Sequence, residues 1–223
     1  MQVPRFPTNT PIDKILGGGL EKGAITNIFG PPGSGKTNVA LCSLLNVKSA
    51  FYVDTEGSFS LERFYQLGGS AKKMQAVVLV EPGTWQEQHK CILQLESSIK
   101  KSKPEIIIVD SLVALYRLEL DGKNFQQVNR QLATQYSVLS KIARTLDIPV
   151  LVTNQVYSTG EDVELTSRQI ARYWSKCLIE LKRGKKVGHR IALLRKHRSL
   201  PEGKEVQFEI KQNSLKEVKL GLF

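Results

Sequence analysis

A glycine-rich segment near the N-terminus holds the residues whose types and spacing are best suited to chemistry. Residues 30–37 read Gly-Pro-Pro-Gly-Ser-Gly-Lys-Thr, which completes the pattern G-x-x-x-x-G-K-T. The glycines leave room for backbone N–H groups to approach a phosphate, Lys36 supplies a positive charge for the β- and γ-phosphates, and the hydroxyl of Thr37 is a ligand for Mg²⁺. The pattern predicts a loop that binds ATP or GTP, and the alternative is a glycine-rich turn that matches it by chance.

The whole loop and the residue that follows it are candidate nucleotide contacts. An apolar, β-prone run precedes the loop, and residues 38–47 carry apolar side chains at helical intervals, so a strand, the loop and a helix should follow one another. The positive end of such a helix faces the phosphates. The candidate contacts are Gly30, Pro31, Pro32, Gly33, Ser34, Gly35, Lys36, Thr37 and Asn38.

Three more polar residues stand at or just beyond the ends of predicted strands. Asp110 follows four apolar residues, so a buried strand would hold its carboxylate where Mg²⁺ is bound. Glu56 lies two residues past a second strand, where a carboxylate orients or deprotonates the water that attacks a γ-phosphate, although a surface glutamate in a turn fits equally well. Gln155 ends a third strand, where its amide either senses the γ-phosphate or merely caps the strand.

Strands and helices alternate along the first two-thirds of the chain, and they must bring these polar residues together. The alternation predicts a parallel sheet with helices on both faces, in which the carboxyl ends of the strands share one edge. The run at residues 76–80 is apolar throughout, as expected for a strand buried on both faces. The other expected strands are residues 49–54, 105–110 and 148–153, and the expected helices are residues 59–67, 84–100 and 124–146.

The alternation of strands and helices ends at about residue 166, and a short helix is expected at residues 167–174. Residues 1–22 contain three prolines and three consecutive glycines, so we expect an irregular lead-in and no separate N-terminal domain. The sequence predicts a single α/β domain over residues 1–223, with a mostly parallel central sheet flanked by helices and antiparallel strands at its C-terminal edge. Those additional strands are expected at residues 177–182, 189–196, 205–211 and 215–218.

The positive charge of the chain is concentrated in its last quarter. The formal net charge is +11, and residues 168–205 alone hold twelve lysines and arginines against three glutamates. A concentrated positive field indicates a polyanion partner, of which DNA of either strandedness, bound through its phosphates with little sequence preference, is one kind. The alternative is a solvated basic face without a partner. The candidate DNA contacts are Arg168, Arg172, Lys182, Arg183, Lys185, Lys186 and Arg190.

Cysteine usage and hydropathy limit the classes of protein that fit. Cys42, Cys91 and Cys177 are far apart in sequence and lack the spacing of a disulfide framework or a zinc site, which indicates a reducing, intracellular setting. The N-terminus lacks the apolar core of a signal peptide, and no apolar run approaches the ~18 residues of a membrane span. We therefore expect a cytoplasmic protein, associated with the nucleoid and not with a membrane.

Four motifs, taken in order, resemble the ATPase core of the RecA/RadA recombinases. They are GPPGSGKT, YVDTEGSF, IIIVDSLVALYR and VLVTNQV, and the similarity extends from about Pro11 to the end of the chain. The resemblance implies a RecA-like P-loop ATPase core with ATP and Mg²⁺ as ligands. It implies that Glu56 is the catalytic glutamate, that Asp110 is the acidic residue of the second nucleotide motif, and that Gln155 links the state of the γ-phosphate to a DNA-binding loop.

The resemblance assigns three further residues to the nucleotide. Arg63 matches an arginine that packs on adenine, and Pro201 matches the proline of a cap that a neighbouring subunit places over the nucleotide. Lys196 stands where the recombinases tend to carry an aspartate beside a bound cation. We interpret its ammonium group as a replacement for that cation.

The sequence also departs from the recombinase pattern in its expected DNA loops. The segment after Gln155 is short and carries Glu161, Asp162 and Glu164, and the first loop, residues 118–124, has Lys123 as its only cation. The motif that joins recombinase subunits lies in a linker that this sequence does not show. We therefore expect a core-only archaeal paralogue of the recombinases.

We expect that paralogue to be an ATP- and DNA-binding accessory protein of homologous recombination and DNA repair, with weak ATPase activity and no strand exchange of its own. The main alternative is a DNA-dependent ATPase that forms filaments and exchanges strands. A P-loop kinase for a small molecule and a nucleotide-switched adaptor are further alternatives. The expected partners are DNA, a recombinase or a junction-resolving nuclease, and further copies of the chain.

Overall fold

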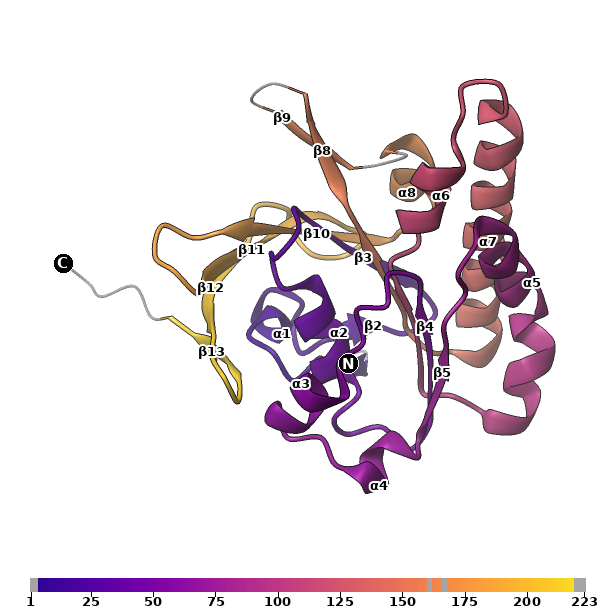
Figure 1. Cartoon of the computed structure of the whole chain (residues 1–223). Coiled ribbons are helices and arrows are strands. Elements are labelled where there is room, and N and C mark those ends of the chain that lie inside the picture. Colours follow the sequence, from indigo (N-terminus) through magenta and orange to yellow (C-terminus); the bar gives the residue numbers. More distant parts are fainter. Residues whose placement is uncertain (1–3, 160–161, 166–167, 219–223) are drawn as a thin grey trace.

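A nine-stranded sheet forms the centre of the molecule (Figure 1). The structure, a computed structural model, describes residues 4–159, 162–165 and 168–218. The strand order is β13-β12-β11-β10-β3-β7-β6-β4-β5, in which the six strands from β10 to β5 are parallel and β11, β12 and β13 are antiparallel. This arrangement confirms the predicted α/β class, with a mostly parallel sheet and antiparallel strands at the C-terminal edge.

The central parallel strands are buried along their whole length. Every residue of β3 (Ile25–Phe29), β4 (Ala50–Asp54), β6 (Ile106–Asp110) and β7 (Val150–Asn154) is buried. Such continuous apolar runs are typical of strands covered on both faces. At about 1.5–3 kcal/mol for each fully buried aliphatic side chain, this core holds the carboxyl ends of the strands in place.

The prediction for residues 76–80 is wrong in one respect. The strand exists as β5 (Val77–Val80), but it is the last strand of the sheet and pairs only with β4. The side chain of Val78 is 43% exposed. The apolar composition predicts the strand, whereas only the order of strands decides that it lies at the edge.

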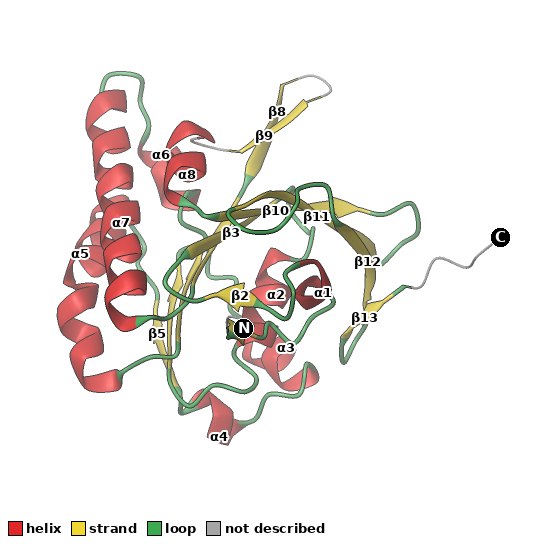
Figure 2. Ribbon diagram, turned by 180° about the vertical axis from the view of Figure 1, so that it is seen from behind, coloured by secondary structure: helices red, strands yellow, loops and turns green. Residues whose placement is uncertain are grey.

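Helices cover both faces of the sheet (Figure 2). On one face α5 (Trp85–Ser102) packs against α7 (Phe125–Leu146), the longest described helix, and both contribute to one apolar cluster. On the other face α1 (Ile12–Ile15), α2 (Lys36–Ser43) and α3 (Leu61–Gln66) lie inside the curve of the antiparallel strands. The predicted cap of α5 is present, because the backbone N–H of Glu87 donates to the hydroxyl of Thr84 at 3.2 Å.

Several short elements were not expected from the sequence. The segment that should be an irregular lead-in contains α1 and a two-stranded ribbon of β1 (Arg5–Phe6) and β2 (Leu20–Glu21). Gly19 permits this pairing, since a Cβ there would lie 2.1 Å from the carbonyl oxygen of Phe6. The helices α4 (Ala71–Met74) and α6 (Ala114–Glu119) are also additional.

The segment after Gln155 forms a ribbon where the sequence indicates a short loop. The strands β8 (Val156–Thr159) and β9 (Asp162–Leu165) pair antiparallel and extend away from the main sheet (Figure 1). Glu161, one of the acidic residues expected there, lies outside the described residues. The helix α8 (Arg168–Trp174) follows and returns the chain to the sheet.

The direction of the C-terminal strands decides which residues reach the phosphate loop. The strand β10 (Cys177–Arg183) pairs in parallel with β3, so its carboxyl end lies at the same sheet edge as the loop. The strand β11 (His189–His197) runs back, and its carboxyl end therefore lies at the opposite edge. The antiparallel strands β12 (Glu205–Ile210) and β13 (Leu215–Glu217) complete the sheet. In the described part of the chain, no helix combines the length and apolar character that crossing a bilayer requires.

Candidate nucleotide-binding site

The glycine-rich loop joins β3 to α2 and has the backbone of an anion cradle. Gly33 and Gly35 have φ values of 71° and 102°, in the left-handed region that a side chain disfavours. Gly35 is the N-cap of α2, and no side chain caps the helix there, so its first N–H groups are free to bind an anion. A Cβ at Gly30 would lie 2.3 Å from the carbonyl oxygen of Leu181, which explains the need for glycine at this position. The loop fits a chain of phosphates.

Lys36 lies inside this cradle and bonds to the loop itself. Its side-chain nitrogen donates to the carbonyl oxygens of Gly30 at 2.8 Å and Pro31 at 3.1 Å. The residue is only 9% exposed, and burial lowers the pKa of its ammonium group, an effect that the negative charges of Asp110 and Glu56 oppose. Neutral carbonyls are weaker partners for a buried cation than an anion is, so the position suits a phosphate ligand.

Asp110 and Thr37 come together as the sequence predicts for a magnesium site. Asp110 is 2% exposed and accepts hydrogen bonds from the hydroxyl of Tyr52 at 2.9 Å, from the hydroxyl of Thr153 and from that of Thr37. Burial raises the pKa of Asp110, and these hydroxyl bonds oppose the rise. A carboxylate and a hydroxyl side by side are the hard oxygen ligands that Mg²⁺ prefers, so the donor set fits this ion.

Glu56, Gln155 and Arg117 form a chain of hydrogen bonds at the same edge. The amide nitrogen of Gln155 donates to a carboxylate oxygen of Glu56 at 3.0 Å. The guanidinium of Arg117 donates to the amide oxygen of Gln155 at 2.8 Å. Arg117 lies near the end of α6, directly before the loop at residues 118–124 that the resemblance assigns to DNA. The chain therefore connects the candidate catalytic carboxylate to that loop.

Sequence reasoning missed Arg117, although it lies within the quoted segment IIIVDSLVALYR. It stands seven residues after Asp110, and its place beside Gln155 becomes apparent only once a helix is known to begin at residue 114. Sequence reasoning also missed Tyr52 and Thr153. Their side chains meet Asp110 from neighbouring strands, which the linear sequence does not show.

The turn that carries Glu56 is held by a second buried aspartate. Asp54, at the end of β4, is 1% exposed and accepts from the backbone N–H groups of Glu56 at 3.1 Å and Phe59 at 2.7 Å. The hydroxyl of Thr55 donates to the carbonyl oxygen of Ser111 at 2.6 Å and accepts from its N–H at 3.0 Å. The ends of β4 and β6 are thereby tied together, which places Glu56 beside Asp110.

Arg63 flanks the phosphate loop on the side of α2. Its guanidinium donates to the side-chain oxygen of Asn38 at 2.7 Å and to the carbonyl oxygens of Gln212 at 2.5 Å and Lys211 at 2.9 Å. It thus joins α3, the first turn of α2 and the turn between β12 and β13. The assignment of Arg63 to adenine stays a prediction.

Lys196 and Pro201 lie at the other edge of the sheet. Lys196 pairs with Leu178 near the start of β10, and its ammonium group donates to the carbonyl oxygens of Arg172 at 2.5 Å and Ser175 at 2.8 Å. It therefore caps the C-terminal end of α8. Pro201 is exposed in the loop between β11 and β12. Neither residue reaches the phosphate loop of its own chain, so their predicted contacts require the nucleotide of another copy.

The candidate DNA-binding residues divide into two groups, those that bond to the phosphate loop and those that do not. Arg172 meets Lys196 at the far edge of the sheet through its carbonyl oxygen, and the others with described side chains lie in the hairpin between β10 and β11. Lys185 and Lys186 are exposed at its tip, and Arg172 is exposed on α8. The side chain of Lys182 is 44% exposed, and its ammonium nitrogen lies 3.7 Å from the carboxylate of Glu180. The side chain of Arg168 lies outside the described part of the chain.

Arg183 and Arg190 form the second group, at the base of the hairpin. They face each other across the two strands and bond to the phosphate loop. Arg183 donates to the carbonyl oxygen of Pro32 at 2.8 Å, and Arg190 donates to that of Gly33 at 2.9 and 3.2 Å.

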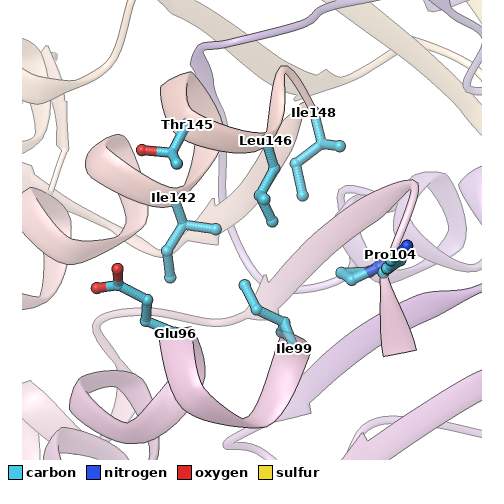
Figure 3. A pocket seen from close by; sticks show the side chains of 8 residues that line it. Glu96, Ile99, Pro104, Ile142, Thr145, Leu146 and Ile148 are labelled. Atoms are coloured by element: carbon cyan, nitrogen blue, oxygen red, sulfur yellow. The ribbon is translucent and has the colours of Figure 1, made fainter. Parts of the chain in front are cut away.

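A separate hollow lies at the amino ends of the strands, between the C-terminal ends of α5 and α7 (Figure 3). It measures about 480 Å³ and is lined mainly by apolar side chains, with Ile99, Ile142, Leu146 and Ile148 among them. None of the predicted site residues lines it. The predicted chemistry therefore belongs to the carboxyl edge of the sheet and not to this hollow.

Comparison with known proteins agrees with this fold. The family model described as Rad51 matches residues 6–218, and the chain belongs to this family. It is similar to proteins named "DNA repair and recombination protein RadB". The one from Methanobrevibacter smithii is 39% identical over 95% of each chain. The one from Methanococcus maripaludis (strain C7) is 40% identical over 92% of this chain and 96% of its own.

A solved structure supports the same placement. The "Crystal structure of the RadB recombinase" matches with a TM-score of 0.84 and 34% sequence identity, and the match covers 96% of this chain and 100% of that chain. The resemblance to the RecA/RadA recombinases and to their core-only paralogue is confirmed, as is the fold. The chain is thus a relative of proteins of DNA repair and recombination.

Proposed function

We propose that the chain binds ATP with Mg²⁺, binds DNA, and assists homologous recombination and repair with weak ATP hydrolysis and no strand exchange of its own. The observation that carries the proposal is the convergence of Lys36, Thr37, Asp110, Glu56 and Gln155 at one edge of the sheet. These residues lie up to 119 positions apart in sequence, and each has a distinct task in binding or cleaving a triphosphate. The names of the RadB relatives support the setting, which we place at the nucleoid.

Nucleotide binding uses the loop and its lysine. The N–H groups of the loop and of the first turn of α2 surround the phosphates, and Lys36 exchanges the carbonyls of Gly30 and Pro31 for phosphate oxygens. Thr37 and Asp110 hold Mg²⁺, which neutralises charge on the phosphates. Asp110 is already oriented by Tyr52 and Thr153, so little reorganisation is needed when the metal ion binds.

Hydrolysis depends on Glu56, which orients the attacking water or accepts its proton. Its carboxylate is exposed, and Gln155 holds one of its oxygens at 3.0 Å. Pro201, which the resemblance assigns to the cap over the nucleotide, lies at the opposite edge of the sheet, as does Lys196, which we interpret as a replacement for a bound cation. A single copy therefore leaves its own site open to water, and this is a physical reason for slow turnover.

DNA binding rests on the members of the basic set that do not bond to the phosphate loop. Arg172, Lys182, Lys185 and Lys186 are available to DNA phosphates, and such contacts carry little sequence preference. Arg168 belongs to the same set by sequence. Gln155 and Arg117 give the nucleotide site a route to the loop at residues 118–124, so that the presence of a γ-phosphate changes the DNA contact.

The test of this proposal is the ATPase rate of the purified chain with and without DNA. We expect slow turnover that DNA changes only a few-fold, together with ATP binding that is lost in Lys36→Ala. The intact chain should also retain single-stranded DNA on a filter without promoting strand exchange. If the intact chain fails to bind ATP or ADP in the presence of Mg²⁺, the proposal is refuted.

One observation favours a second function, that of a filament-forming recombinase. Lys196 and Pro201 stand at the sheet edge opposite the phosphate loop, which is the arrangement that a head-to-tail assembly needs if one copy is to complete the site of the next. Stimulation of ATP turnover by DNA over several orders of magnitude, with strand exchange, would favour this function over the first.

A further inference from the structure

We propose that Arg183 and Arg190, at the base of the hairpin between β10 and β11, read the terminal phosphate of the bound nucleotide and so distinguish ATP from ADP. The inference rests on the proposed nucleotide binding and extends it. It gives these two arginines a task at the nucleotide in place of the DNA contact that the sequence predicts for them.

Three cations converge on four consecutive carbonyl oxygens of the phosphate loop. Lys36 bonds to those of Gly30 and Pro31. Arg183 bonds to the next one, at Pro32, and Arg190 bonds to the one after it, at Gly33. Within the described residues no carboxylate lies within 4 Å of any of the three cationic groups. The three positive groups therefore bond to neutral carbonyl oxygens, and none of them forms an ion pair with a described carboxylate.

The two guanidinium groups lie close to each other and directly on the loop. Arg183 and Arg190 are cross-strand partners, and a Cβ added to Gly33 would lie 3.3 Å from a terminal nitrogen of Arg183. Like charges placed opposite each other on neighbouring strands are destabilising unless an anion joins them. Burial and the nearby positive charge of Arg183 both lower the pKa of Arg190, as expected for two guanidinium groups that lie close together.

The position beside Lys36 indicates which phosphate the arginines meet. In a loop of this type the backbone N–H groups surround the inner phosphates, and the lysine reaches the outer ones. The arginines bond to the carbonyls that directly follow those held by Lys36, so they stand at the outer end of the phosphate chain. A guanidinium binds phosphate oxygens through two parallel hydrogen bonds, which a carbonyl oxygen does not offer.

The hairpin is closed tightly enough to hold both arginines in place. A Cβ at Gly184 would lie 2.8 Å from the Cβ of His189, and the backbone N–H of Gly184 donates to the carbonyl oxygen of His189 at 2.8 Å. Val187 at the tip is fully exposed, whereas the base rests on the loop. The hairpin thus presents its tip to solvent and its base to the nucleotide.

The experiment compares affinities for ADP and for the imido analogue of ATP, which is not hydrolysed, by isothermal titration calorimetry with Mg²⁺. We expect Arg183→Ala and Arg190→Ala each to weaken binding of the analogue about tenfold and that of ADP less than twofold. Arg183→Lys should give an intermediate loss, because the charge remains without the paired hydrogen bonds. Arg130→Ala, on the exposed face of α7, is the matched control and should change neither affinity.

Three results would overturn the inference. An equal loss of affinity for both nucleotides would show that the arginines only support the loop. Unchanged affinities, with weaker binding of single-stranded DNA in the absence of nucleotide, would assign them to DNA. Failure of the intact chain to bind either nucleotide would refute the proposed function itself, and this outcome is distinguishable because it appears before any substitution is made.

Discussion

The parallel and antiparallel halves of the sheet present their functional residues in opposite ways. In the parallel half, Asp110 and Thr153 are buried, and hydrogen bonds within the chain hold them before any ligand binds. In the antiparallel half, Lys185 and Lys186 are exposed, and no described residue forms an ion pair with either of them. The difference teaches that the candidate nucleotide site is organised by the fold of one copy, whereas no described carboxylate holds the side chains of the two lysines.

The physical reason lies in how each half is covered. Strands that are buried on both faces fix the direction of the side chains at their ends. A carboxylate such as that of Asp110 is therefore held in one orientation. The antiparallel strands turn back to the opposite edge and carry Lys196 and Pro201 away from the phosphate loop. Arg190, at the start of β11, still bonds to that loop, so the antiparallel half contributes residues to both edges.

The largest expected effect comes from Glu56→Gln, which tests the parallel half alone. The amide keeps the shape of the side chain but does not accept a proton from the attacking water, so the ATPase rate should fall about 100-fold. ATP affinity and DNA affinity should change less than threefold. Steady-state phosphate release and calorimetric titration measure the two quantities. A fall in ATP affinity equal to the fall in rate would contradict the assignment of Glu56 to the chemical step.

The double variant Lys185→Ala, Lys186→Ala tests the antiparallel half alone. Loss of two phosphate contacts should weaken single-stranded DNA binding about tenfold and reduce the slope of log K against log salt by about 1.4. Nucleotide affinity should stay the same. Fluorescence anisotropy with a labelled oligonucleotide over a range of salt concentrations gives the slope. An unchanged slope would show that the hairpin tip does not meet the DNA backbone.

Arg117→Ala tests a link within the parallel half, from Gln155 to the loop at residues 118–124. It removes the bond of 2.8 Å to Gln155, so the amide is no longer tied to α6. The gain in DNA affinity that ATP produces should fall about threefold, in line with the loss of one exposed hydrogen bond. DNA affinity in the absence of nucleotide should stay the same in Arg117→Ala. It should also stay the same in Lys123→Ala if Lys123 does not contact DNA. An equal loss with and without ATP would make Arg117 a direct DNA contact instead.

The smallest effect concerns His197, at the edge opposite the phosphate loop. Its Nδ1 atom accepts from the backbone N–H groups of Ser199 at 3.0 Å and Leu200 at 3.1 Å, and its side chain is 1% exposed. Burial lowers the pKa of His197 from its ordinary value of 6.5, and Glu21 opposes the shift. These contacts shape the loop that carries Pro201.

The sign of the pH dependence follows from that lowered pKa. The unfolded chain takes up a proton near pH 6.5 while the folded chain resists it, so stability is complete above that pH and declines as the pH falls below it. Histidine changes charge between about pH 7 and about pH 5. Over this range the Tm of His197→Gln should fall about 2 °C less than the Tm of the intact chain. His189→Gln is the matched control. Equal slopes for the two variants would rule out this role.

The sequence reveals the phosphate loop because the loop is local. Its glycines, its lysine and its threonine are consecutive, and the apolar runs on either side predict the strand and the helix that the structure contains. Glu56, Asp110 and Gln155 are also found as candidates from local patterns, since each stands at or just beyond the end of an apolar run, and the family resemblance supplies their expected roles. Arg117 and the arginines of the hairpin base were not assigned to this site, because their contacts join segments far apart in the chain.

The sequence by itself determined the α/β class, the cradle at residues 30–37 and the excess of positive charge after residue 168, because composition, periodicity and motif spacing are properties of neighbouring residues. Only the tertiary structure decided that Arg183 and Arg190 lie on the phosphate loop while Lys196 and Pro201 lie at the far edge. The reason is the direction of two strands: β10 runs parallel to β3, and β11 runs back. Strand direction depends on pairing between distant segments, which sequence spacing does not encode.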